Sequence, residues 1–204
     1  MSWAVLEPLL TLTDEGLEAI TTQRKYGVVI SHTRTSMPAS YNVDTNRCEL
    51  NFSLKSPTLA SYFVHEMVHA HFYKGGWISD FNELSQSDYV AEMVTEEYIA
   101  TTRQYQFFVT LDVKGQLPGV SRAASDMPPR YAEYRSAYDY GVKRARRVTS
   151  DASRLHLLGI INANQLLKYH IREGGLGVGI FSYREYYGRE WQKNKNQKNK
   201  LKKP

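Results

Sequence analysis

Residues 63–71, FVHEMVHAH, contain the pattern H-E-x-x-H within a segment predicted to be helical. At about 100° per residue, His65 and His69 lie one turn apart on the same helix face, so their imidazoles can converge on one ion. Glu66 projects beside them, where it would polarise a metal-bound water rather than take a ligand position. Zinc prefers four ligands, and a catalytic site keeps one position for water. The pattern therefore predicts a zinc site with His65 and His69 as ligands and Glu66 as general base.

The neighbouring sequence supports a helix around this pattern. Ser56-Pro57 is typical of a helix start, and Gly75-Gly76 is typical of a helix end, which predicts a helix over 57–73. Before it, two β-prone runs, 39–43 and 48–52, flank turn-forming residues and predict an antiparallel hairpin. We therefore expect the helix to follow directly on a small sheet.

The remaining pattern predicts an α+β domain, in which a small antiparallel or mixed sheet packs on the active-site helix and further helices complete the core. No element is predicted firmly over 176–191, and residues 193–204 are predicted to be a disordered Lys-rich tail after a single domain, 1–192. The other predicted elements are a helix over 14–24, a strand over 26–30, and helices over 87–111, 130–147 and 150–172.

The third metal ligand has to come from another element, and the helix predicted over 87–111 offers several acids. Its inward stripe contains position 97 at helical spacing, and a buried acid is costly unless it is paired or bound to a metal. We therefore predict Glu97 as the third ligand. Glu92 and Glu96 are expected on a different face, near Arg103, where solvation accounts for them. The alternatives that remain open as the third ligand are Glu96, Glu92, Asp80 and Asp88.

These residues resemble the zincin metallopeptidases, in particular those whose third ligand is a downstream glutamate. His65-Glu66-Met67-Val68-His69 matches the active-site helix of that family. Glu97-Tyr98-Ile99-Ala100 resembles the E-x-x-A pattern of small members such as ImmA/IrrE-type peptidases and the metallopeptidase domains of bacterial toxins and effectors. The metzincin extension is absent, because positions 72 and 75 are Phe72 and Gly75. The resemblance implies a zincin-like fold and zinc-dependent cleavage of peptide bonds in a protein or peptide substrate.

The sequence does not identify the residue that would stabilise the oxyanion of the tetrahedral intermediate in peptide hydrolysis. His156, His170 or a tyrosine are the candidates. Tyr131, Tyr134 and Tyr138 lie at helical spacing, and core packing is expected for them. Cys48 is the one cysteine of the chain, which excludes an intramolecular disulfide and a Cys-rich metal site.

The distribution of charge along the chain bears on a second functional hypothesis, a binding module instead of an enzyme. The net charge is +5, but the last twelve residues hold six lysines, and without them 20 basic residues face 21 acidic ones. A body so balanced is not expected to coat nucleic acid. The alternative to an enzyme is a zinc-containing regulatory or binding module, whose basic tail makes weak, nonspecific contact with nucleic acid or an anionic membrane.

The location of the protein is also predicted only in outline. No apolar run is long enough to span a bilayer. The first eight residues lack the basic region of a standard signal peptide. We therefore expect a cytoplasmic protein, or one exported by a route that needs no signal peptide, as a toxin or effector would be.

Overall fold

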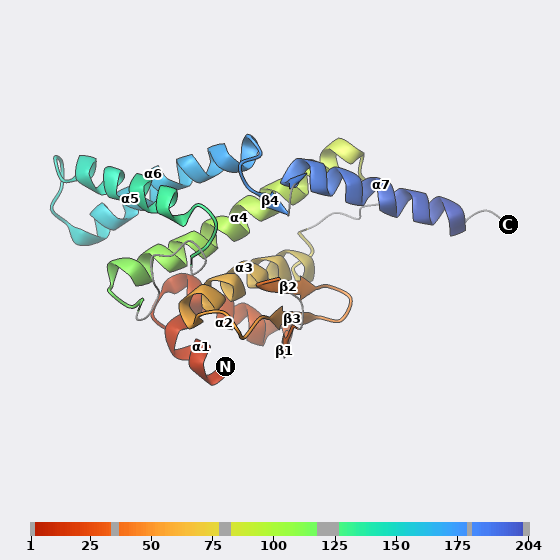
Figure 1. Cartoon of the computed structure of the whole chain (residues 1–204), viewed down its shortest axis with the longest axis horizontal. Coiled ribbons are helices and arrows are strands. Elements are labelled where there is room, and N and C mark those ends of the chain that lie inside the picture. Colours follow the sequence, from red (N-terminus) through yellow and green to blue (C-terminus); the bar gives the residue numbers. More distant parts are fainter. Residues whose placement is uncertain (1–2, 34–36, 78–82, 118–126, 179–180, 202–204) are drawn as a thin grey trace.

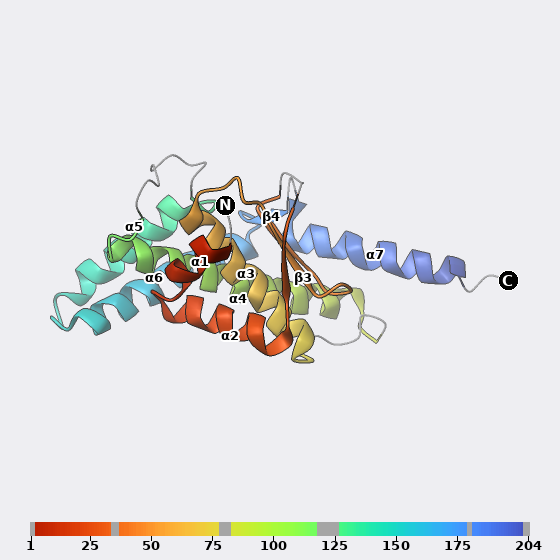
Figure 2. The ribbon, with the colours of Figure 1, turned by 90° about the horizontal axis from the view of Figure 1, so that it is seen from below.

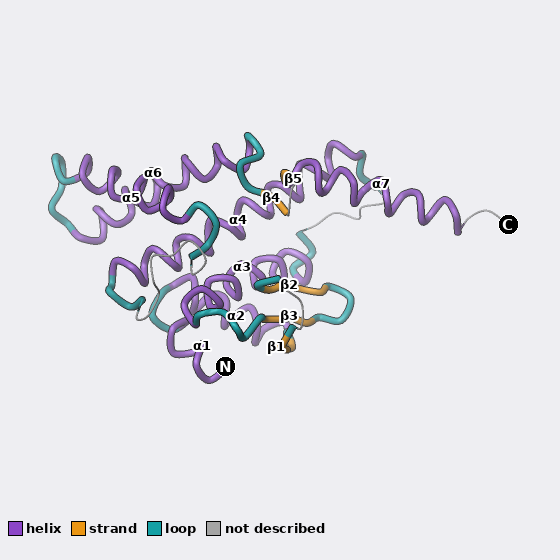
Figure 3. The backbone as a smooth tube through the Cα atoms, in the orientation of Figure 1, coloured by secondary structure: helices purple, strands orange, loops and turns teal. Residues whose placement is uncertain are grey.

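The computed structural model of the chain is a mixed α+β fold in which helices predominate (Figure 3). It describes residues 3–33, 37–77, 83–117, 127–178 and 181–201. The helices are α1 (Trp3–Leu10), α2 (Asp14–Tyr26), α3 (Ser56–Lys74), α4 (Gln86–Val113), α5 (Tyr131–Ala145), α6 (Ala152–Arg172) and α7 (Tyr183–Leu201). The strands are β1 (Val29–His32), β2 (Ala39–Asn42), β3 (Arg47–Leu50), β4 (Gly177–Val178) and β5 (Phe181–Ser182).

The sheet of the N-terminal half has the order β1-β3-β2. β2 and β3 form the predicted antiparallel hairpin, and β1 joins β3 in parallel, which makes the sheet mixed. β1 begins later than the predicted strand 26–30, because α2 continues to Tyr26 and Gly27 then takes a left-handed conformation (φ 62°) that ends the helix. The edge strand β2 lies against α3.

Helix α4 runs between two layers of the molecule (Figures 1 and 2). One face packs with α1, α2, α3 and the sheet into a first core, to which it contributes Phe107 and Leu111. The opposite face packs with α5, α6 and α7 into a second core, to which it contributes Phe108 and Val109. Tyr131, Tyr134 and Tyr138 are buried in this second core, and Cys48 is buried in the first, as predicted. Residues adjacent in sequence therefore serve different cores.

Two terminal helices differ from the sequence-based expectations. α1 contains Pro8 yet remains helical, because it buries Leu6 and Leu10 completely in the first core. The segment left unassigned forms the β4–β5 hairpin and then α7, which continues to Leu201 where a disordered tail was expected after residue 192. Lysine, glutamine and leucine are good helix formers, so a helix anchored by buried tyrosines can extend through them. None of the helices in the described ranges has the length and apolar character needed to cross a membrane.

The α5–α6 hairpin depends on close approach of two glycines. A Cβ at Gly159 would lie 2.6 Å from Cε2 of Tyr138 and 2.8 Å from Cγ2 of Val142. Gly141 faces Gly159 from α5, and a Cβ at Gly141 would lie only 3.1 Å from the Cα of Gly159. Only glycine at 159 allows the two helices to pack at this distance.

We predict that Gly159→Ala lowers the free energy of unfolding by up to about 2 kcal/mol, since overpacking costs about 1–3 kcal/mol and alanine's helix propensity returns about 1 kcal/mol. Urea unfolding followed by circular dichroism measures this. Gly188→Ala is the matched control, because its Cβ would meet only Gln86 Nε2 at 3.4 Å and Val90 Cγ2 at 4.0 Å. If both variants were at least as stable as the wild-type protein, the close contact at Gly159 would be contradicted.

Candidate metal centre

The H-E-x-x-H residues lie on α3, which packs along α4 (Figure 1). The rings of His65 and His69 come close together, with their centroids 4.8 Å apart. Across from them, α4 presents the carboxylate of Glu97. These three side chains offer ligand atoms that all lie within 4.8 Å of one another, and they are the one such group of three found in the described residues. The structure therefore brings together the three predicted ligands in a group that could hold a metal ion.

The distances in this group suit a tetrahedral ion. His65 Nε2 lies 3.5 Å from Glu97 Oε2, and His69 Nε2 lies 3.7 Å from Glu97 Oε1. Two ligand atoms held about 2.0 Å from one ion at a tetrahedral angle are about 3.3 Å apart. Both histidine-to-carboxylate distances are thus close to the spacing of ligands on one ion, and all three donors lie within 4.8 Å of one another, so the group could hold a metal ion.

Glu96 has a different part in the site from the one predicted. We expected it on a solvated face near Arg103, but it is only 1% exposed, and its Oε1 lies 2.7 Å from Nδ1 of His69. Arg103 instead pairs with Glu18 at 3.3 Å. A carboxylate on the far nitrogen of a ligating histidine fixes the ring's orientation and leaves Nε2 to face the ion. Glu96 is therefore the residue that orients His69.

The electrostatics of the site favour a proton on His69 in the metal-free protein. Burial alone would lower the pKa of His69, but the hydrogen bond to Glu96 and the charges of Glu97 and Glu66 raise it to about 9. Burial alone would raise the pKa of Glu97, but the hydrogen bond with His65 and the charge of His69 lower it to about 2. At neutral pH the metal-free site thus holds an imidazolium between two carboxylates.

The C-terminal helix also reaches the site. The hydroxyl of Tyr187, on α7, donates a hydrogen bond of 2.5 Å to Oε1 of Glu97. Burial, together with the charge of Glu97, raises the pKa of Tyr187 well above its ordinary value, so it stays a neutral donor. Tyr187 therefore gives the Glu97 carboxylate a partner from a third helix, in addition to the two histidines of α3.

Glu66 lies in the same cleft as the three candidate ligands. The cleft has a volume of about 1030 Å³, and Glu66, His65, His69 and Glu97 all line it. Glu66 is only 8% exposed, and it is absent from the group of ligand atoms. The structure thus places Glu66 beside the three candidate ligands but outside their group.

The other acids considered as ligands do not join the group. Asp88 is at the start of α4, where its backbone N–H donates to Oγ of Ser85 at 3.2 Å and its carboxylate accepts from the same hydroxyl at 2.6 Å. Glu92 is half-buried one turn before Glu96 and does not belong to the donor cluster. Asp80 lies outside the described residues.

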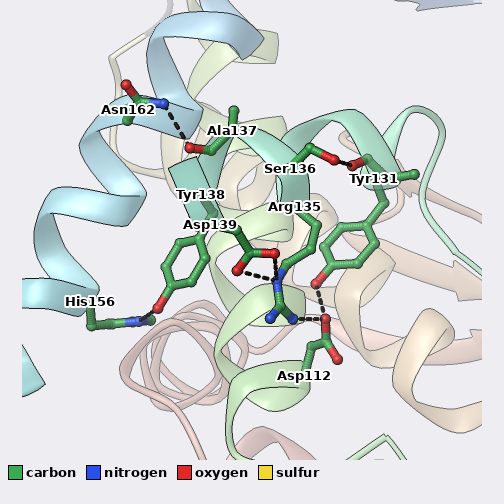
Figure 4. A network of polar contacts seen from close by, with 10 residues as sticks. Asp112, Tyr131, Arg135, Ser136, Ala137, Tyr138, Asp139, His156 and Asn162 are labelled. Carbon is green, nitrogen blue, oxygen red and sulfur yellow. Dashed lines mark hydrogen bonds and ion pairs between the residues drawn. The ribbon is translucent and has the colours of Figure 1, made fainter. Parts of the chain in front are cut away.

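The two histidines considered for oxyanion stabilisation lie elsewhere. Nδ1 of His156 and the hydroxyl of Tyr138 are 2.9 Å apart, in a polar network around Arg135 and Asp112 that joins α4, α5 and α6 (Figure 4). His170 Nε2 lies 2.9 Å from Oε2 of Glu133. Neither histidine lines the metal cleft, so the tyrosines of the cleft remain the candidates.

Sequence reasoning named Glu96 only as an alternative ligand and missed its contact with His69, and it missed Tyr187 altogether. A second buried stripe on α4 could have revealed Glu96, because positions 93, 96, 100, 104, 107 and 111 also follow helical spacing and all are buried. No comparable signal existed for Tyr187, which lies 90 residues after Glu97 in a segment without a predicted element.

The chain matches no protein-family model, no curated protein and no solved structure. The resemblance to the zincin metallopeptidases therefore rests on the H-E-x-x-H helix and the downstream glutamate alone.

We predict that zinc binding to the metal-free protein releases about one proton at pH 7.5, because the pKa of His69 is about 9 there and Nε2 has to lose its proton before it binds. The zinc affinity should rise about tenfold per pH unit as the pH increases from neutrality toward 9, then level off. Calorimetry in buffers of different ionisation enthalpy measures the proton count. An affinity that is flat above pH 7 would contradict the raised pKa.

We also predict that Glu96→Gln weakens zinc binding by about 10- to 100-fold and reduces the proton release, because the uncharged amide no longer holds a proton on His69. Glu92→Gln, one turn earlier on the same helix, is the control and should leave both quantities unchanged. Loss of zinc binding in Glu92→Gln, with normal binding in Glu96→Gln, would reverse the assignment of the two acids.

Proposed function

We propose that the protein is a zinc-dependent metallopeptidase, in which His65, His69 and Glu97 hold the ion and Glu66 is the general base. The observation that carries this proposal is a group of three ligand side chains that opens onto a large cleft. Structural zinc sites are closed by four protein ligands, whereas catalytic sites have three and keep one position for water or substrate. The open cleft therefore favours catalysis over a purely structural metal.

The chemistry divides between the ion and the side chains. Zinc, when bound, supplies Lewis acidity and lowers the pKa of a coordinated water toward about 7. Glu66 accepts the proton that the nucleophilic water loses, and later delivers it to the leaving amine. Its burial at the cleft wall keeps it beside the ligands rather than in bulk water.

The tyrosines of the cleft supply neutral hydrogen-bond donors. Burial, with the charge of Glu66, raises the pKa of Tyr62 to about 12. Tyr62 lines the cleft and remains protonated at neutral pH, whereas the hydroxyl of Tyr105 already donates to the backbone oxygen of Pro129. The hydroxyl of Tyr62 is therefore suited to stabilise negative charge that develops on a substrate carbonyl oxygen.

We predict that Glu66→Gln lowers kcat/KM for peptide hydrolysis by about 100- to 10,000-fold, while zinc remains bound at one ion per chain. Glu97→Gln should instead lose the zinc, because it removes a charged ligand. Metal analysis and cleavage of an unbiased peptide mixture measure the two properties. Removal of zinc by a chelator should abolish cleavage of that mixture, and addition of zinc should restore it.

The outcome that contradicts the proposal is a zinc-loaded wild-type protein that cleaves no peptide, or full activity in Glu66→Gln. The first result would favour the alternative function, a zinc-containing binding module. In that case the Lys-rich end of the chain should bind nucleic acid or anionic vesicles in a salt-sensitive way, and deletion of residues 193–204 should abolish that binding.

A further inference from the structure

Tyrosines form one wall of the metal cleft. α7 presents residues 183, 186, 187 and 190 at the spacing i, i+3, i+4 and i+7, so they share one helix face. α7 lies against the start of α4, where Gln86 Nε2 donates to the backbone oxygen of Gly188 at 3.1 Å and the ring of Tyr89 meets that of Tyr187. We call Tyr89, Tyr183, Tyr186 and Tyr187 the tyrosine wall, and all four line the cleft.

The rings of the tyrosine wall are in contact. Tyr187 is at the centre, with ring centroids 5.1 Å from Tyr186, 6.3 Å from Tyr89 and 6.5 Å from Tyr183. Tyr187 is also the residue that donates to Glu97, which places the wall directly beside the candidate metal ligands. Aromatic faces carry negative potential and attract cations.

When a metal ion is bound and His69 is neutral, the charged side chains that line the cleft are all acidic. The described residues that line it include no lysine and no arginine, but they include Glu66, Glu97 and Glu190. A divalent ion balances the charges of Glu66 and Glu97. The charge of Glu190 remains, on the same helix face as three members of the tyrosine wall.

Glu190 acts on the rings next to it. Burial raises the pKa of Tyr89 to about 12, and the charge of Glu190 is the next cause; the same two causes raise the pKa of Tyr186. Within α7, Lys193 Nζ lies 3.8 Å from Glu190 Oε1, but the lysine side chain is 63% exposed. An exposed pair of this kind is weak, so a cation bound in the cleft can replace Lys193 as the partner of Glu190.

We propose that the cleft binds a lysine or arginine side chain of the substrate against the tyrosine wall, with Glu190 as its counter-charge. This inference rests on the proposed peptidase function and adds a substrate class to it. A substrate acid at the same position would meet Glu190 and the ring faces without a cation to pair with. A neutral side chain of equal length would gain apolar contact but lose the charge interaction.

The first experiment is cleavage of a mixture of decapeptides by the zinc-loaded protein. We expect lysine and arginine to be enriched, and aspartate and glutamate depleted, at one position near the cleaved bond. The best sequence is then made in three forms that carry lysine, norleucine or glutamate at that position. We expect kcat/KM for lysine to exceed that for norleucine by about fivefold to tenfold.

Variants of Glu190 and its neighbour test whether Glu190 is the counter-charge for the basic side chain. Glu190→Gln should reduce the ratio of lysine to norleucine to near one. Lys193→Gln should increase that ratio, because it removes the competing partner. Glu18→Gln is the charge-matched control and should leave it unchanged, since Glu18 is an exposed residue of α2 that pairs with Arg103 and does not line the cleft.

A binding measurement separates this inference from the proposed function. Zinc-loaded Glu66→Gln is titrated, by calorimetry, with decapeptides of alanine and glycine that carry one central lysine, norleucine or glutamate. We expect the lysine peptide to bind most tightly, and its advantage to disappear when Glu190→Gln is added.

The outcomes are distinct. Cleavage without preference for a basic side chain, or a preference that survives in Glu190→Gln, overturns the inference and leaves the peptidase proposal standing. Absence of cleavage overturns the peptidase proposal, and the binding measurement then decides the inference alone. Equal binding of the lysine and glutamate peptides overturns it in either case.

Discussion

Two adjacent carboxylates, Glu96 and Glu97, are buried in the middle of α4, and the arrangement of the surrounding helices follows from the need to satisfy them. Burial of a carboxylate is costly unless it is paired, hydrogen-bonded or bound to a metal. Neighbouring residues on a helix point about 100° apart, so the two acids need partners in different directions. α3 supplies both histidines, and α7 supplies the hydroxyl of Tyr187. The placement of α3 and α7 on α4 is thereby tied to the chemistry of the site.

The position of α4 explains why the site is both ordered and accessible. One of its faces belongs to the core of the N-terminal layer and the other to the core of the C-terminal layer. The candidate ligands lie where these layers meet, on helices whose backbones are held by packing on both sides, and such rigid elements position functional groups well. The remaining side of the site opens to the tyrosine-rich cleft. A ligand could therefore reach the site without disruption of either core.

The same arrangement makes the site depend on both ends of the chain. The N-terminal layer supplies His65, Glu66 and His69, whereas the C-terminal helix holds Glu97 and forms much of the cleft wall. In the metal-free protein, the raised pKa of His69 and the lowered pKa of Glu97 leave a proton between the acids, in the place where a cation would otherwise be bound. The site is thus stabilised by positive charge in either state, and a metal ion has to compete with a proton for it.

The sequence by itself determined the local features of this protein. H-E-x-x-H indicated a helix with two histidines on one face, helical periodicity selected Glu97, and turn residues indicated the β2–β3 hairpin. These depend on spacings of a few residues, which the chain's own geometry sets. Only the tertiary structure decided the role of Glu96, the approach of Tyr187 and the helical form of the Lys-rich end. Periodicity marks one inward face, but α4 is buried on two, and contacts across 27 or 90 residues leave no local pattern from which to infer them.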